Sequence, residues 1–97
     1  MNKPTLKSLV GKRVHFIGIG GAGMSGLARI SLSHGITVSG SDAKDSSVVK
    51  ALQALGATIA TTHAASNVDG ADLVVYSTAI SPSNAELMRA QELGLST

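Results

Sequence analysis

The 97-residue sequence contains no cysteine, two prolines and very few aromatic side chains. The absence of cysteine excludes both a disulfide framework and a thiolate site. Aromatic residues supply 2% of the chain and hydrophobic residues 43%, so the core must consist mainly of Val, Ile, Leu and Ala. Such a core is typical of a parallel sheet covered by helices. We therefore expect one small α/β domain.

Long apolar runs are also lacking. No stretch approaches the length of a membrane span, and the lysine-bearing start of the chain lacks the apolar segment of a signal peptide. The net charge is +2, and much of the positive charge lies in a basic lead-in over residues 1–13. No aromatic residues are interleaved there to stack on bases. We expect a cytoplasmic protein that binds neither nucleic acid nor membranes, and nothing in the sequence indicates an obligate protein partner.

Strand and helix patterns alternate along the chain. Short apolar runs typical of buried strands lie at 14–19, 36–39, 57–60 and 71–76. Helical spacing of apolar residues predicts helices at about 22–34, from 45 or 46 to 55, and from 83 to 93. A glycine follows each predicted helix as a stop. This order predicts a Rossmann-like parallel sheet with helices on both faces.

The last predicted helix has a local start signal. Ser83 and Glu86 form the pattern S-x-x-E, which predicts a capping box. Asn67 is expected to cap the turn that follows the third strand, and His15 to be structural. After Gly94 the alternation requires another strand, so we expect the chain to be truncated from a longer multidomain protein.

Glycines are concentrated directly after the first predicted strand. Gly18, Gly20 and Gly23 match G-x-G-x-x-G between a strand and a helix. In this motif Gly18 permits a tight turn, Gly20 lets backbone N–H groups reach a diphosphate, and Gly23 lets the helix pack close to the strand. The helix N-terminus adds N–H donors and partial positive charge. Asp42 follows Gly23 by about 20 residues, where an acid commonly accepts hydrogen bonds from ribose hydroxyls. A nucleotide diphosphate site is therefore predicted; a turn that serves only packing would leave these glycines unexplained.

Several segments carry a more specific resemblance. HFIGIGGAGMSGLA at 15–28, followed by VSGSD at 38–42, closely resembles the N-terminal domain of the Mur ligases of peptidoglycan synthesis. HAASN at 63–67 and VVYSTAISPSNAEL at 74–87 continue the similarity, which covers about residues 14–97. A dehydrogenase would rarely have the doubled glycine with Met-Ser-Gly after it. An NAD-binding domain of an oxidoreductase is the alternative outside this family.

The resemblance implies a division of labour between domains. The N-terminal domain of these ligases binds the UDP part of UDP-N-acetylmuramate, a central domain binds ATP, and a C-terminal domain binds the incoming amino acid. The lactyl carboxylate is activated as an acyl phosphate with magnesium assisting, and an amine then attacks to form an amide. The resemblance is closest to members that add L-alanine and second to those that recycle cell-wall tripeptide. The central domain's G-K-[ST] element is missing, since the only Gly-Lys pair, Gly11-Lys12, precedes Arg13. The chain alone is therefore expected to bind UDP-sugar and to be catalytically inactive.

The motif and the resemblance together imply a set of substrate contacts. These are Gly18, Gly20, Gly21, Ala22, Gly23, Met24, Ser25, Ser41, Asp42, His63, Ser77, Thr78 and Ala79. The His63 imidazole is expected to donate to a phosphate or uracil oxygen, and an ordinary surface histidine is the alternative. Asp69 and Asp72 have no second carboxylate or histidine at ligand spacing, so no metal site is expected.

Overall fold

The computed structural model describes residues 9–44, 46–77 and 80–94. Its elements in chain order are β1 (Arg13–Ile17), α1 (Ala22–Ser33), β2 (Thr37–Ser41), α2 (Ser47–Ala54), β3 (Thr58–Ala60), the 3-10 helix η2 (Ala65–Val68), β4 (Leu73–Tyr76) and α3 (Ala85–Glu92). The predicted alternation of strands and helices is confirmed. The boundaries differ by one to two residues, since β1 ends at Ile17 and β2 reaches Ser41.

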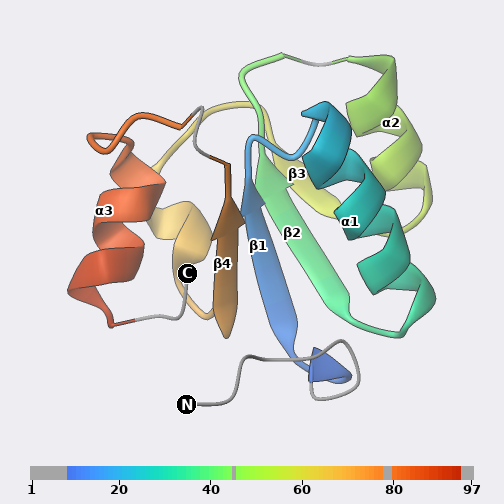
Figure 1. Cartoon of the computed structure of the whole chain (residues 1–97), viewed down its shortest axis with the longest axis horizontal. Helices are drawn as coiled ribbons and strands as arrows, with labels where there is room; N and C mark the ends of the chain where they lie inside the picture. Colours follow the sequence, from blue (N-terminus) through green and yellow to red (C-terminus); the bar gives the residue numbers. More distant parts are fainter. Residues whose placement is uncertain (1–8, 45, 78–79, 95–97) are drawn as a thin grey trace.

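The four strands form one parallel sheet in the order β3-β2-β1-β4 (Figure 1). Val14 of β1 lies opposite Val38 of β2 on one side and Leu73 of β4 on the other. The chain therefore builds outward from β1 to β3, returns, and adds β4 on the opposite side of β1. In parallel sheets such a reversal of strand order leaves a crevice at the carboxyl ends of the two strands that flank it, here β1 and β4, and ligands bind in such crevices.

Alternate side chains of each strand enter two separate cores. Val14, Phe16 and Val38 belong to the core beneath α1 and α2. Ile17 and Val74 belong to the core beneath α3 and η2 on the other face (Figure 1). The predicted Rossmann-like sheet with helices on both faces is therefore confirmed. Within the described ranges, no helix is both long and apolar enough to cross a membrane.

The helix ends follow the glycine stops, but one helix start differs from the prediction. Gly35, Gly56 and Gly94 follow α1, α2 and α3 with φ angles of 77°, 112° and 68°, which favour glycine. At the start of α3 the Oδ1 atom of Asn84 accepts hydrogen bonds from the backbone N–H groups of residues 86 and 87. The predicted capping box of Ser83 and Glu86 is therefore wrong. The Glu86 side chain points into the protein, where it is fully buried.

Candidate functional site

The carboxyl ends of all four strands meet at one edge of the sheet, uppermost in Figure 1. The described residues predicted to contact substrate lie in the loops at this edge, in the first turn of α1, or at the last position of β2. They therefore come together as the motif requires. Thr78 and Ala79, which were also predicted, lie outside the described residues.

The glycine loop, residues 18–21 between β1 and α1, crosses the end of β2. The N–H groups of Gly18 and Ile19 both donate to the Ser41 carbonyl oxygen, at 2.8 and 3.0 Å. The Gly21 N–H donates to the Gly18 carbonyl oxygen at 3.1 Å and closes a turn. Gly18 has φ +75°, a backbone conformation that residues with a side chain rarely adopt. The tight turn predicted for Gly18 is therefore confirmed.

Gly20 contacts Asp42 directly. Its N–H donates to Asp42 Oδ2 at 2.8 Å, while Oδ1 of the same carboxylate accepts the Lys44 N–H at 2.9 Å. A Cβ atom at Gly20 would lie 2.7 Å from Asp42 Oδ2 and 3.3 Å from Val49 Cγ2. A side chain at position 20 would therefore displace the Asp42 carboxylate from the loop. Asp42 joins the glycine loop to the loop that follows β2.

The glycine packed closely against neighbouring backbone is Gly40, which the G-x-G-x-x-G motif does not include. A Cβ atom there would lie 2.7 Å from Ile19 Cδ1 and 2.9 Å from the Phe16 carbonyl oxygen. A Cβ atom at Gly23 would meet nothing within 4 Å. The expectation that Gly23 allows close packing of helix on strand is therefore wrong. Gly23 instead leaves open space in the first turn of α1.

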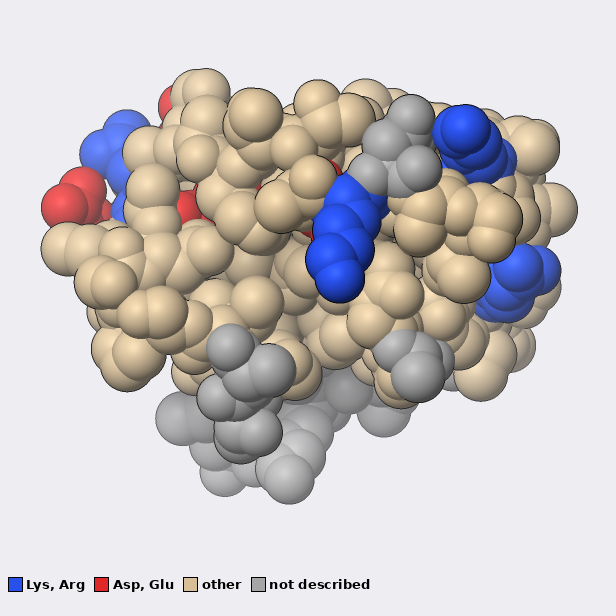
Figure 2. Space-filling model, turned by 90° about the horizontal axis from the view of Figure 1, so that it is seen from above, with Lys and Arg blue, Asp and Glu red and all other residues tan. Residues whose placement is uncertain are grey.

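The N-terminus of α1 is suited to an anion. Gly21 is its N-cap, no described side chain caps it, and its first turn contains no acidic residue. The first N–H groups of a helix have no partner within the helix and carry partial positive charge. Lys44 is the only Lys or Arg among the described residues of the strand-end loops, and it is exposed. Figure 2 looks onto this edge, where uncharged side chains predominate and the Lys and Arg side chains stand apart.

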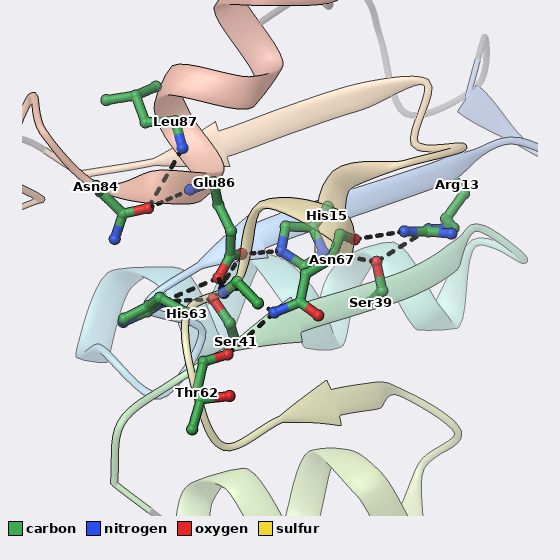
Figure 3. A network of polar contacts seen from close by, with 11 residues as sticks. Arg13, His15, Ser39, Ser41, Thr62, His63, Asn67, Asn84, Glu86 and Leu87 are labelled. Atoms are coloured by element: carbon green, nitrogen blue, oxygen red, sulfur yellow. Dashed lines mark hydrogen bonds and ion pairs between the residues drawn. The ribbon is translucent and has the colours of Figure 1, made fainter.

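A buried polar network lies next to this edge, on the α3 face of the sheet (Figure 3). Its centre is the carboxylate of Glu86, whose Oε1 accepts from His15 Nε2 at 2.5 Å and from Ser41 Oγ at 2.8 Å. Its Oε2 accepts from His63 Nδ1 at 3.1 Å, from the backbone N–H of residue 64 at 3.2 Å, and from Asn67 Nδ2 at 3.3 Å. Five donors therefore converge on one carboxylate.

These donors decide the ionisation of Glu86. Burial opposes the charged form and by itself raises the pKa of Glu86. The hydrogen bonds from His15 and Ser41, the electrostatic interaction with the His15 ring and the hydrogen bond from Asn67 act the other way and outweigh it. The pKa of Glu86 therefore lies below its ordinary value. The carboxylate is negatively charged inside the protein at neutral pH.

The network continues away from the strand ends. His15 Nδ1 lies 2.8 Å from Ser39 Oγ, which also accepts from Arg13 Nε at 3.1 Å. Arg13 Nη2 donates to the Asn67 carbonyl oxygen at 2.7 Å. The structural role expected for His15 is confirmed, whereas the capping role expected for Asn67 is wrong, since no side chain caps η2. Across the described ranges, every buried side-chain nitrogen and oxygen has a hydrogen-bond partner.

His63 joins the network to the candidate site. Its Nδ1 lies 2.8 Å from Ser41 Oγ, and its side chain is 28% exposed. Ser41 itself is fully buried, so its hydroxyl forms hydrogen bonds with His63 and Glu86 inside the protein. Among the residues that the structure describes, no group of three or more His, Asp or Glu side chains is arranged to hold a metal ion.

A model of the Mur ligase family, catalytic domain, matches residues 13–97. The chain belongs to the Mur ligase family. Its sequence is 63% identical over 83 residues to the UDP-N-acetylmuramate–L-alanine ligase of Renibacterium salmoninarum, which covers 86% of this chain and 18% of that Mur ligase. The crystal structure of the UDP-N-acetylmuramate–alanine ligase of Thermotoga maritima superposes with a TM-score of 0.83 at 35% identity, covering 88% of this chain and 20% of that one.

A second Mur ligase structure is similar to nearly the same degree. It is the UDP-N-acetylmuramate:L-alanyl-gamma-D-glutamyl-meso-diaminopimelate ligase of Neisseria meningitides, with a TM-score of 0.80 and 35% identity. The similarity covers 88% of this chain and 27% of that one. This chain spans about a fifth of the length of the curated Mur ligases it matches.

Proposed function

We propose that this domain binds the UDP part of UDP-N-acetylmuramate as the N-terminal domain of a ligase that adds L-alanine. One observation carries the proposal. The glycine loop, the uncapped N-terminus of α1 and Asp42 lie together at the carboxyl edge of the sheet, where the strand order reverses between β1 and β4. An anionic group and a group rich in hydroxyls can be held side by side there. A nucleoside diphosphate has both.

Each part of the ligand has a proposed contact. The diphosphate lies against the glycine loop and the first turn of α1, which includes Ala22, Met24 and Ser25. The open space at Gly23 leaves room for it to approach the helix. Each carboxylate oxygen of Asp42 accepts one backbone N–H and has a further lone pair. Asp42 accepts hydrogen bonds from the ribose hydroxyls with these remaining lone pairs. His63 and Ser77 contact the ligand from the loops after β3 and β4, and the buried Ser41 acts through His63.

The reaction itself belongs to the proposed longer protein. There ATP and magnesium, held by a central domain, activate the carboxylate of UDP-N-acetylmuramate as an acyl phosphate, and L-alanine from a C-terminal domain forms the amide. The G-K-[ST] element of such a central domain is absent from these 97 residues. The chain alone therefore binds the UDP-sugar without catalysis. Its cytoplasmic location remains a prediction.

A second candidate within the family is a ligase that takes a tripeptide. The equal sequence identity of 35% to the Thermotoga and Neisseria structures keeps it open. The similarity to proteins named as L-alanine ligases, at 52% and 63% identity, favours the first candidate. Both printed names include UDP-N-acetylmuramate, so the ligand proposed for this domain is the same in either case.

Calorimetric titration of the chain with UDP-N-acetylmuramate, UDP and NAD tests the proposed ligand. We expect both UDP compounds to bind more tightly than NAD, because the ligand is recognised by family-specific loops as well as by the generic glycine motif. Tightest binding of NAD would contradict the proposal and favour the dinucleotide-binding alternative.

A further inference from the structure

The hydrogen bonds around His63 determine where its proton lies. Nδ1 faces Glu86 Oε2 at 3.1 Å, and an ionised carboxylate only accepts hydrogen bonds. Nδ1 also faces Ser41 Oγ at 2.8 Å, but the single hydroxyl proton of Ser41 is donated to Glu86 Oε1. Both neighbours therefore require a donor, and Nδ1 must carry a proton.

A proton on Nδ1 decides what the rest of the ring can do. In a neutral imidazole only one nitrogen carries a proton, so Nε2 is then an acceptor. The His63 side chain is 28% exposed, and its Nδ1 is turned toward fully buried groups. The exposed part of the ring therefore lies on the side away from Nδ1. The ring presents a lone pair on the outward side, next to the proposed nucleotide site.

We propose that Glu86 and Ser41 are positioning residues that hold His63 in the Nδ1–H form, so that Nε2 accepts a hydrogen bond from an N–H or O–H group of the bound nucleoside. This inference rests on the proposed function and names the ligand group that His63 selects. It replaces the expectation that His63 donates to a phosphate or uracil oxygen. A phosphate oxygen has no proton to offer Nε2, whereas ribose hydroxyls and the uracil N3–H do.

The same carboxylate orients a second histidine in the opposite way. His15 Nε2 faces Glu86 Oε1 and must donate to it, while Nδ1 faces Ser39 Oγ. Ser39 Oγ accepts from Arg13 Nε and retains its own proton for His15 Nδ1. Glu86 therefore assigns the Nε2–H form to His15 and the Nδ1–H form to His63. These opposite tautomers give the proposal an internal comparison within one protein.

Long-range ¹H–¹⁵N NMR of the histidine rings in the unliganded chain tests the assignment directly. The spectra also show at which pH each ring is neutral. At that pH we expect His63 to show a protonated Nδ1 and an unprotonated Nε2, and His15 the reverse. A neutral His63 ring with its proton on Nε2 would overturn the inference.

Glu86→Gln tests whether the carboxylate holds the tautomer. A glutamine amide offers one oxygen where two carboxylate oxygens accept five donors, so the His63 ring should become a mixture of tautomers and UDP affinity should fall about tenfold. Glu92→Gln on the same helix is the matched control, because Glu92 is exposed and forms an ion pair with Arg89 at 3.4 Å; it should change neither quantity. Ser41→Ala, which removes one of the two groups facing Nδ1, should also lower the Nδ1–H population. An unchanged tautomer in every folded variant at positions 86 and 41 would refute the positioning role.

Ligand titrations then identify the group that Nε2 accepts. UDP should shift the His63 Nε2 resonance, and inorganic pyrophosphate should not. Loss of the shift with 3-methyl-UDP identifies the base, and loss with 2′-deoxy-UDP identifies the sugar. A shift caused by pyrophosphate would overturn the inference. If UDP shifts the glycine-loop amides but leaves Nε2 unchanged, the inference fails while the proposed function stands; if UDP binds nowhere, both fail.

Discussion

His15 and Glu86 lie 71 positions apart in the sequence, yet their Nε2 and Oε1 atoms are 2.5 Å apart inside the protein. The contact joins β1 to the first turn of α3 on the face of the sheet that α3 covers, in the network next to the carboxyl edge. It is one of five hydrogen bonds to the Glu86 carboxylate, which is ionised although it is fully buried. The charge is stable there because these hydrogen bonds and the electrostatic interaction with His15 outweigh the cost of burial.

Removing the Glu86 carboxylate should strongly destabilise the fold. Glu86→Ala leaves His15, Ser41 and Asn67 without their buried acceptor, and such losses typically cost about 3–5 kcal/mol. Glu92→Ala, on the exposed side of α3, should change the free energy of unfolding by no more than about 0.5 kcal/mol. Urea unfolding of both variants measures the difference. A loss below about 1 kcal/mol for Glu86→Ala would mean that the network contributes little.

The contribution of Glu86 should disappear in acid. Its pKa is lowered in the folded protein, so the stabilisation is complete above the ordinary pKa of a glutamate, about 4.3, and is lost as the pH falls through the lower folded value. The difference in unfolding free energy between the unmodified protein and Glu86→Gln should therefore be constant near pH 7 and shrink below about pH 4.3. Urea unfolding as a function of pH measures it. A difference that grows toward low pH would contradict the assigned direction of the shift.

Two glycines should respond to alanine in opposite ways. At Gly40 a Cβ atom would lie 2.9 Å from the Phe16 carbonyl oxygen, so Gly40→Ala should destabilise the protein by about 1–3 kcal/mol. Gly23 has open space in the first turn of α1, so Gly23→Ala should leave the unfolding free energy unchanged or raise it by up to about 1 kcal/mol. Thermal unfolding followed by circular dichroism compares them. Equal destabilisation by both substitutions would contradict this assignment.

Asp42 should distinguish the ribose from the phosphates. Charge-assisted hydrogen bonds contribute about 1.5–3 kcal/mol, so Asp42→Ala should weaken UDP binding by roughly ten- to a hundredfold. The substitution also frees the Gly20 N–H and removes a negative charge beside the loop, so pyrophosphate should bind no less tightly. Asp42→Asn should be milder, because its amide oxygen still accepts one bond. Equal losses for UDP and pyrophosphate would show that Asp42 only shapes the loop.

The fold was predictable because its signals are local. Short apolar runs marked each strand, and Gly35, Gly56 and Gly94 marked the helix ends with the backbone conformation that glycine favours. The tight turn at Gly18 follows from the same reasoning. The carboxyl edge of the sheet could be predicted as the site, since parallel strands place all their following loops together.

The buried network was not predictable, because it depends on side chains that only the tertiary fold brings together. Glu86 matched the S-x-x-E pattern, but Asn84 caps α3 and frees Glu86 to turn inward. His15 and Ser39 occupy ordinary strand positions that give no sign of a shared partner. The glycine motif likewise specifies where side chains are absent without specifying what fills the space. At Gly20 the space is filled by Asp42, and at Gly23 it remains open.

The most direct test of the account is ¹H–¹⁵N correlation NMR of the backbone during titration with UDP. If the nucleotide binds at the carboxyl edge, the largest shifts should fall on the amides of Gly18, Gly20, Gly21, Asp42, His63 and Ser77. Amides at the opposite edge, such as those of Gly35, Gly56 and Gly94, should remain unchanged. Shifts confined to that opposite edge, or saturating with NAD at lower concentration than with UDP, would contradict the proposal that this domain holds the UDP part of UDP-N-acetylmuramate.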